Sequence, residues 1–311
     1  MARKQQVNET PAIWYQASAC SGCAVSLLNG AAPSVKALLI DQVVPGQHVS
    51  LRFQPTVMAG AGEAALQVLD AAQEAQEGYL LVVEGAIPTA SDWYGFVGHK
   101  PDGSPYGMAE RVIGLARSAL AVVAVGTCAA YGGMHGAHPN PTGCKGVGEV
   151  LREAGVDTPV VNVPGCPPHP DWFTGTVVDI LLHGLPGAEA VDAAGRPLRF
   201  YGSLIHDLCE RRSDFEAHKF ARAPGEPGCL YELGCKGPFT HADCPERQFN
   251  QGTSWCVKAG GPCQGCTEPT FPDVQCPLYR KIPYDAQPRI VRDPGSGELV
   301  AVTKPSQEAG E

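Results

Sequence analysis

The sequence predicts an α/β fold, with a doubly wound parallel sheet in its first half and an irregular, metal-stabilised second half. Between residues 12 and 187, short β-rich runs alternate with amphipathic helical stretches. This alternation fades after about residue 190, and the next 90 residues hold eight cysteines among many glycines and prolines. Because so irregular a segment has little means of building an apolar core, we expect disulfides or metals to hold it together.

Six strands and four helices are expected in the first half. We expect strands at residues 12–16, 37–44, 49–53, 79–83, 120–125 and 160–163, and helices at residues 62–75, 108–119, 147–154 and 172–182. Runs of β-branched and aromatic residues favour the strands, and apolar residues three or four positions apart favour the helices. Alternation of this kind is typical of a parallel sheet with helices on both faces.

The composition excludes several classes of protein. The chain has 311 residues, of which 44% are hydrophobic, and a formal net charge of −9, which argues against nucleic acid or anionic lipid as its main partner. No apolar run approaches the roughly 20 residues of a membrane span. Charged residues make up only 18% of the chain, so we expect part of its surface to be covered by another polypeptide.

The two ends of the chain bear on its location and domain organisation. The first six residues include two charged ones and lack the apolar stretch of a signal peptide, so we expect a reducing cytoplasm, where the 13 cysteines act as metal ligands or free thiols. The tail has few aromatic residues and none of the usual thiol or imidazole ligands, which is typical of an extended arm. The expected domains are residues 1–190, residues 191–279 and the arm at 280–311.

Four cysteines of the first half follow predicted strands. Cys20 and Cys23 come after the first strand, Cys128 follows the strand at 120–125, and Cys166 follows the strand at 160–163. In parallel sheets, ligands bind in the loops at the carboxyl ends of the strands. We therefore expect these four thiols to converge at one edge of the sheet.

Spacing sorts the possible ligands into three sets of four. The sets are Cys20, Cys23, Cys128 and Cys166; His206, Cys209, Cys229 and Cys235; and Cys244, Cys256, Cys263 and Cys266. Taken alone, the first Cys-x-x-Cys pair is also consistent with a redox motif and the last with half a zinc site. Thiolate sets bind either Zn²⁺ or iron–sulfur clusters. Three sites in one chain favour a series of redox clusters.

Several longer motifs surround these ligands. They are CSGC at 20–23, SLLN at 26–29, VEGAIP at 83–88, GTCAAYGG at 126–133, PNPT at 139–142, NVPGCPP at 162–168, HDLCERR at 206–212, GCKGP at 234–238 and PCQGC at 262–266. At these motifs the sequence resembles the small, electron-transferring subunit of [NiFe] hydrogenases, over residues 12 to 273. The resemblance implies a flavodoxin-like first domain and a second domain stabilised by iron–sulfur clusters.

The resemblance also implies a type and a place for each cluster. A proximal [4Fe-4S] cluster would use Cys20, Cys23, Cys128 and Cys166, and a distal [4Fe-4S] cluster would use His206, Cys209, Cys229 and Cys235. A medial cluster would use Cys244, Cys263 and Cys266. Many family members have proline at the fourth medial position and hold a [3Fe-4S] cluster there. This sequence has Cys256, so we expect a medial [4Fe-4S] cluster, or [3Fe-4S] if Cys256 is not a ligand.

The activity implied by the resemblance is shared between two chains. The Ni-Fe centre lies in a separate large subunit, so no catalytic residue is expected here, and this chain would relay electrons from H₂ oxidation to an acceptor. His206 would mark the exit of electrons. Glu84 would lie near the proximal cluster, although a turn or helix-capping role is an equal alternative. The expected partners are the large subunit and an acceptor protein or quinone-linked partner, with a dimer of heterodimers as a further possibility.

Two other functions stay open at this point. The chain is also consistent with the small subunit of a cytoplasmic, regulatory hydrogen-sensing hydrogenase, which shares the fold and the clusters. A third alternative is the related quinone-reductase subunit of respiratory complex I. That subunit resembles only the N-terminal half, and the ligand sets at His206 and at Cys263 disfavour it.

The sequence departs from some relatives in three further respects. Gly22 and Gly133 stand where oxygen-tolerant members have two additional cysteines, so an ordinary proximal [4Fe-4S] cluster is expected. Cys144 and Cys276 fall outside the three sets, and we expect them to be inert thiols. The family's leader and its C-terminal membrane anchor are not recognised in this sequence. This favours a cytoplasmic protein, with membrane association only through a partner.

Overall fold

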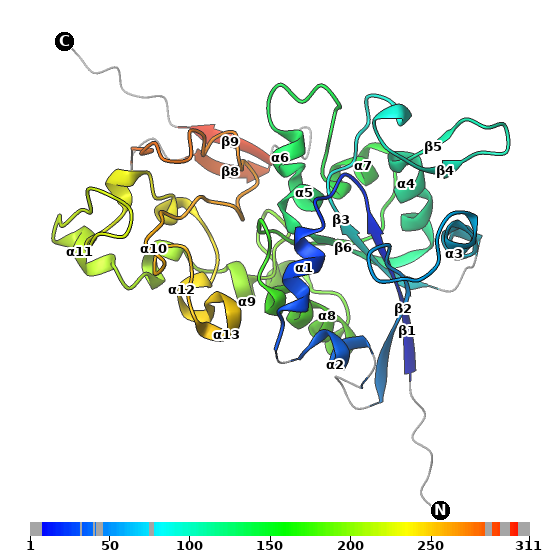
Figure 1. Ribbon diagram of the computed structural model, residues 1–311, viewed down its shortest axis with the longest axis horizontal. Helices are drawn as coiled ribbons and strands as arrows, with labels where there is room; N and C mark the ends of the chain where they lie inside the picture. The colour runs from blue at the N-terminus through cyan, green and yellow to red at the C-terminus, as the bar shows by residue number, and fades with distance from the viewer. Residues whose placement is uncertain are drawn as a thin grey trace, which may run out of the picture. The chain divides into compact units, whose positions relative to one another are not determined.

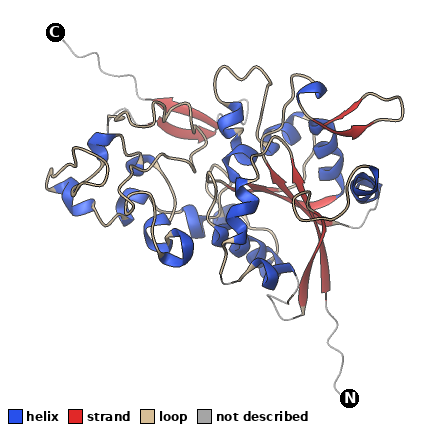
Figure 2. Ribbon diagram, in the orientation of Figure 1, coloured by secondary structure: helices blue, strands red, loops and turns tan. Residues whose placement is uncertain are grey.

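The computed structural model describes residues 8–31, 33–39, 41, 46–74, 78–283, 288–292 and 299–303 (Figure 1). The chain divides into two compact units, Met1–Gly187 and Ala188–Glu311. In the first unit, helices lie on both sides of one twisted sheet, whereas loops and short helices dominate the second unit (Figure 2).

The sheet of the first unit has five parallel strands. They are β1 (Asn8–Gln16), β2 (Gln47–Phe53), β3 (Tyr79–Glu84), β6 (Ala119–Val125) and β7 (Val160–Val163), hydrogen-bonded in the order β2-β1-β3-β6-β7. Numbered among themselves, the strands lie in the order 2-1-3-4-5, which occurs in doubly wound sheets. The predicted parallel sheet is confirmed.

Alternation along the strands buries both faces of the sheet. The helices are α1 (Gly22–Leu28), α2 (Val35–Leu39), α3 (Glu63–Glu74), α4 (Met108–Ser118), α5 (Gly126–Tyr131), α6 (Gly133–Gly136), α7 (Val147–Glu153) and α8 (Pro170–His183). On one face, Ile13 and Leu81 belong to the same buried core as residues of α3, α4 and α7. On the other, Trp14 and Leu80 line an apolar groove with residues of α1 and α8. Successive side chains of a strand point to opposite faces, which explains this division.

Most of the predicted elements agree with the structure, but one strand was wrong. Residues 37–39 of the strand expected at 37–44 lie in helix α2, and positions 40 and 42–44 are outside the described residues. The Ser34 hydroxyl accepts a hydrogen bond from the Ala37 N–H at 3.2 Å, as a helix-capping residue does. Lys36 and Ala37 also favour helix, so this capped turn outweighs the apolar character of the run.

Residues 92–107 form a small excursion from the sheet that was not predicted from the sequence. A 3-10 turn, η1 (Asp92–Tyr94), leads into the antiparallel pair β4 (Phe96–His99) and β5 (Pro105–Gly107). The strands have only four and three residues, so they offer too few alternating positions for a periodic signal.

The second unit is built from short elements. These are η2 (Ala188–Ala190), α9 (Leu198–Tyr201), α10 (Ile205–Leu208), α11 (Arg212–Glu216), η3 (Tyr231–Leu233), η4 (Gly237–Phe239), α12 (Cys244–Arg247) and α13 (Phe249–Gly252). Their buried side chains include four cysteines, namely Cys229, Cys235, Cys244 and Cys263. The lack of long periodic elements agrees with the loss of sequence periodicity after residue 190.

The expected extended arm contains regular structure. Within residues 280–311, β8 (Pro288–Arg292) pairs antiparallel with β9 (Leu299–Thr303). These ten residues of the expected arm therefore form a two-stranded antiparallel sheet. Both segments are rich in β-branched residues, and this preference for strands outweighs the prolines and glycines around them. None of the helices within the described parts of the chain is long and apolar enough to cross a membrane.

Candidate metal centres

The first candidate centre lies at the carboxyl edge of the parallel sheet. Cys20 precedes α1 and Cys23 lies in its first turn, while Cys128 lies in α5 after β6 and Cys166 follows β7. The Cys23 thiolate interacts electrostatically with the thiolates of the other three cysteines. The structure therefore brings this predicted set together from three separate loops.

The proximal thiols are held in a partly buried environment. Burial raises the pKa of Cys23 well above its ordinary value, with a further increase from the Glu84 carboxylate and the neighbouring thiolates. Burial also raises the pKa of Cys128 to about 11 and increases the pKa of Cys166. Since metal ligands must be thiolates, binding of a cationic metal core would stabilise the form that burial disfavours.

Glycines keep the backbone close to these sulfur atoms. Gly126 has φ +84°, and a Cβ at this position would collide with the Cys23 Sγ atom. Gly133 has φ +51°, and its Cβ would lie 2.9 Å from the Cys128 Sγ atom. A Cβ on Gly22 would approach the Cys20 Sγ atom to 3.1 Å. Gly22 and Gly133, where oxygen-tolerant relatives have cysteines, thus lie directly against expected ligands. The lack of side chains at these glycines lets the backbone approach a group bound by the thiols.

Glu84, the last residue of β3, is buried beside this set. Its Oε1 atom accepts hydrogen bonds from the backbone N–H groups of Cys23 at 3.2 Å and Ala24 at 3.3 Å. Its Oε2 atom accepts from Trp14 Nε1 and Gln16 Nε2, both at 2.9 Å. The two expectations for Glu84 are therefore compatible, because the carboxylate both caps the first turn of α1 and adjoins a proximal thiol.

The second candidate centre surrounds a single cavity in the second unit. All four predicted ligands, His206, Cys209, Cys229 and Cys235, line this cavity. The Cys209 thiolate interacts electrostatically with Cys235 and Cys229, and burial raises the pKa of Cys209 to about 11. Burial lowers the pKa of His206, which favours the neutral imidazole that a metal ligand requires. The predicted distal set is therefore chemically suited to a metal group.

The third candidate centre includes the cysteine expected as a fourth medial ligand. The Cys244 thiolate interacts electrostatically with Cys266 and Cys256, and Cys263 interacts with the same two thiolates. Burial raises the pKa of both Cys244 and Cys263 well above the ordinary value. Cys256 therefore lies with the other three cysteines of the medial set.

The second and third sets are joined by backbone hydrogen bonds. The Cys263 N–H donates to the Cys235 Sγ atom at 3.3 Å, and the Lys236 N–H donates to the Cys263 carbonyl oxygen at 2.8 Å. Cys235 of the distal set and the residue that follows it are thus bonded to one residue of the medial set. These residues belong to the GCKGP and PCQGC motifs, but nothing in their spacing along the chain predicts that the two motifs form hydrogen bonds with each other.

The remaining thiols lie outside the three sets. Cys144 is buried and accepts a hydrogen bond from the Thr142 hydroxyl at 3.2 Å, and Cys276 is exposed. Among the described residues, no three His, Cys, Asp or Glu side chains are arranged as ligands of one metal ion. Sulfur atoms that bind different irons of a cluster stand further apart than the ligands of a single ion, so the gathered sets are compatible with clusters.

Two buried groups near the second and third sets, Trp255 and Lys236, were not predicted from the sequence. The Trp255 side chain lines the distal cavity, and its Nε1 donates to the Glu210 Oε2 atom at 3.0 Å. Lys236 is only 1% exposed. The only available signals were a tryptophan before Cys256 and a lysine inside the GCKGP motif, and neither residue type by itself indicates burial.

Comparisons with known proteins agree in both halves of the chain. The family model for the C-terminal part of NiFe/NiFeSe hydrogenase small subunits matches residues 201–279, and that of the NADH ubiquinone oxidoreductase 20 kDa subunit matches residues 20–180. The periplasmic [NiFeSe] hydrogenase small subunit of Desulfomicrobium baculatum is 43% identical over 89% of each chain. The chain belongs to the [NiFe] hydrogenase small-subunit family. The predicted resemblance is confirmed.

Other relatives and solved structures support this membership. The quinone-reactive Ni/Fe-hydrogenase small chain of Wolinella succinogenes is 42% identical over 88% of this chain and 74% of its own length. The solved structure of the D. baculatum Ni-Fe-Se hydrogenase has a TM-score of 0.81 and 44% identity, covering 88% of this chain and all of that one. The actinobacterial-type NiFe-hydrogenase of Ralstonia eutropha H16 has a TM-score of 0.82, 34% identity, and coverage of 90% and 86%.

Family membership fixes the broad role of this chain. It is the small subunit of a [NiFe] hydrogenase, an oxidoreductase whose catalytic site lies in the large subunit with which it pairs. The family holds iron–sulfur clusters. The NADH ubiquinone oxidoreductase model matches the first half alone, whereas the hydrogenase model also accounts for the second, so the complex I alternative is disfavoured.

Proposed function

We propose that this small subunit relays electrons from H₂ oxidation in the large subunit, through three [4Fe-4S] clusters, to an external acceptor. The observation that carries the proposal is the gathering of the twelve predicted ligands into three separate sets. When bound, the clusters would supply one-electron redox chemistry, which the side chains of this chain lack. The 2-1-3-4-5 strand order supports a flavodoxin-like first unit.

Each set would hold one cluster. Cys20, Cys23, Cys128 and Cys166 would hold the proximal cluster, His206, Cys209, Cys229 and Cys235 the distal cluster, and Cys244, Cys256, Cys263 and Cys266 the medial cluster. The electrostatic contacts of Cys256 with Cys244 and Cys263 support its role as the fourth medial ligand. His206 would be the exit side of the relay, because a neutral imidazole makes a ligand set less negative than four thiolates do.

Hydrogen bonds around the sets would position the ligands. Glu84 holds the backbone of the Cys23 turn, so it would orient the proximal thiols. The Cys263 N–H to Cys235 Sγ hydrogen bond joins the medial and distal sets through one short contact. We propose that this contact keeps the medial and distal sets at a fixed distance from each other. A fixed distance matters because the rate of electron tunnelling falls steeply with distance.

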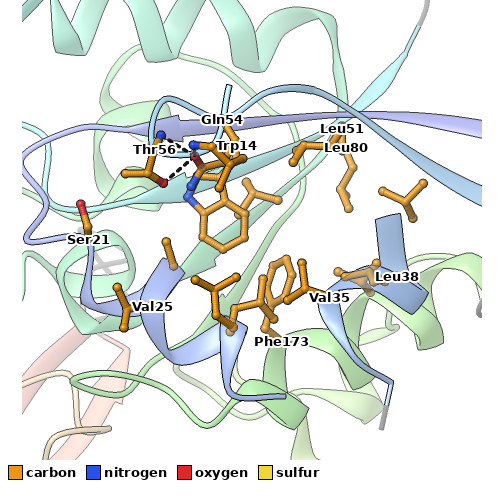
Figure 3. A pocket seen from close by; sticks show the side chains of 18 residues that line it. Trp14, Ser21, Val25, Val35, Leu38, Leu51, Gln54, Thr56, Leu80 and Phe173 are labelled. Atoms are coloured by element: carbon orange, nitrogen blue, oxygen red, sulfur yellow. Dashed lines mark hydrogen bonds between the residues drawn. The ribbon is translucent and has the colours of Figure 1, made fainter. Parts of the chain in front are cut away.

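We propose that the apolar groove beside the proximal set is buried by the large subunit. The groove has a volume of about 160 Å³ and lies between α1, β2 and α8, with Trp14, Leu80 and Phe173 in its wall (Figure 3). Ser21 and Ala24, the chain neighbours of Cys20 and Cys23, line it too. Val25 and Leu28 of α1 are 57% and 62% exposed, which is typical of a surface that another chain buries.

The test is a metal count on the native complex. The complex is isolated without oxygen through a tag on this chain, and nickel, iron and zinc are measured against the amount of heterodimer. Three four-iron clusters and one Ni-Fe centre predict one nickel and about 13 irons. Twelve irons without nickel would keep the clusters but contradict pairing with an assembled Ni-Fe centre, and zinc in place of iron would overturn the proposal. A cytoplasmic location stays a prediction, since the named relatives include periplasmic enzymes.

A further inference from the structure

Lys236 is a buried lysine between the distal and medial sets. Its Nζ atom donates hydrogen bonds to three backbone carbonyl oxygens, those of Gly234 at 2.7 Å, Leu278 at 3.3 Å and Arg280. An ammonium has three N–H donors and no lone pair, whereas a neutral amine would direct its lone pair at one of these oxygens. The geometry therefore suits the charged form.

The charge of Lys236 has no carboxylate partner in the described parts of the chain. No Asp or Glu oxygen there lies within ion-pair distance of its Nζ atom. Burial disfavours the ammonium, and the nearby sulfur atoms of Cys235 and Cys263, which would be thiolates when they ligate a cluster, would stabilise it. A buried charge without compensation is costly, so the ligand thiolates of the bound clusters would be its electrostatic counter-charges.

The backbone of Lys236 fixes its place between the two sets. It directly follows the distal residue Cys235, and its N–H donates to the carbonyl oxygen of the medial residue Cys263 at 2.8 Å. Its Cβ atom would lie 3.3 Å from a Cβ placed on Gly265, inside the PCQGC motif. The side chain is thus packed against segments of both sets.

We propose that the Lys236 ammonium is a fixed buried cation that raises the reduction potentials of both the medial and the distal cluster. The inference rests on the proposed function, because it requires clusters at these two sets. Each reduction adds one electron and hence one negative charge to a cluster, and a nearby cation stabilises the more negative form. Loss of the charge is expected to lower each reduction equilibrium constant on the order of tenfold, which is about 59 mV for a one-electron couple.

A purely structural role is the competing explanation. The carbonyl oxygens of Leu278 and Arg280 belong to the segment that packs against Gly234, where a Cβ would meet the Tyr279 backbone. In the same segment, Lys281 Nζ bonds Glu232 Oε1 at 2.6 Å and lies 4.9 Å from the centre of the Tyr231 ring. The Lys281 side chain is 40% exposed, so its charge is screened by water. It is a matched control for removing a lysine charge from this segment.

The experiment is a reductive titration of the intact heterodimer, followed by EPR. Lys236→Met is expected to move the potentials of the medial and distal signals to more negative values, with the proximal signal unchanged, and Lys281→Met is expected to move none. If Lys236→Met retains all its iron and its potentials equal those of the unmodified complex, the inference is overturned. Absence of iron–sulfur signals from the unmodified complex would instead overturn the proposed function.

Two further variants separate charge from packing if Lys236→Met loses iron. Lys236→Arg keeps the charge, and Lys236→Gln keeps hydrogen-bonding capacity without it. The electrostatic role predicts potentials near the original for Lys236→Arg and more negative ones for Lys236→Gln. Equal shifts in the two variants would show that packing alone matters and would overturn the inference.

Discussion

The carboxylate of Glu84 accepts a hydrogen bond from the backbone N–H of Cys23 at 3.2 Å, although the two residues are 61 positions apart. Glu84 is the last residue of β3, and Cys23 lies in the first turn of α1. The bond therefore ties the edge of the sheet to the loop that carries two proximal thiols. Glu84 is 1% exposed, and each of its two carboxylate oxygens accepts hydrogen bonds from two N–H donors.

Replacement of Glu84 by Gln should weaken this loop. The amide retains one acceptor oxygen but turns an NH₂ group toward N–H donors, leaving buried donors unsatisfied at a cost of about 1–3 kcal/mol. We expect a lower denaturation midpoint of the heterodimer and less proximal iron. The control is Glu149→Gln, which removes a partly exposed partner of Lys145 and should cost under about 0.5 kcal/mol. Equal effects of the two variants would show that Glu84 does not hold the Cys23 turn.

Gly126 offers a second test of the proximal set. Gly126→Ala would place a methyl group against the Cys23 Sγ atom at a residue with φ +84°. Gly155 has φ +63°, and a Cβ there would meet nothing within 4 Å, so Gly155→Ala has the backbone strain without the collision. We expect Gly155→Ala to cost about 1–2 kcal/mol and to keep all its iron. Gly126→Ala should lose proximal iron as well, measured by Mössbauer spectroscopy; full iron content in this variant would contradict a cluster ligated by Cys23.

The sheet and its thiol edge were predictable because they depend on local patterns. The run at 160–163 was predicted with the bounds it has in the structure, since three of its four residues are valines, which favour a strand. Once the strands were placed, the topology of a parallel sheet required Cys128 and Cys166 to emerge at the same edge. The prediction of a strand at 37–44 was wrong for a local reason too, because Ser34, which caps the start of α2, lies outside the apolar run on which the prediction depended.

The second unit was predictable only in part. Its helices are about one turn long, so periodicity gives no basis for pairing His206 with Cys235 across 29 residues, and that grouping came from the spacing of the ligand residues and agreed with the resemblance. The Cys263 N–H to Cys235 Sγ bond and the burial of Lys236 depend on non-local packing. A lysine in a loop is ordinarily exposed, so only the fold reveals a buried cation there.

Cys256 decides the type of the medial cluster. Cys256→Pro should remove one iron per heterodimer and give the EPR signal of an oxidised [3Fe-4S] cluster, with a higher medial potential, because one thiolate ligand is lost. Cys276→Ala removes an exposed cysteine outside the three sets and should change neither iron content nor spectrum. A strong three-iron signal from the intact, unoxidised original protein would show that Cys256 is not a ligand.

Val25 tests where the large subunit binds. It is 57% exposed on α1 and lines the apolar groove beside Cys23, so a charge at this position would be buried without a partner when the groove is covered. We expect Val25→Asp to weaken pairing at least tenfold, measured as the fraction of large subunit that co-purifies with a tag on this chain. Leu120→Asp is the matched control, because Leu120 is 59% exposed but lies near the amino end of β6, at the opposite edge of the sheet from the thiols. If Leu120→Asp disrupts pairing and Val25→Asp does not, another face of this unit binds the large subunit.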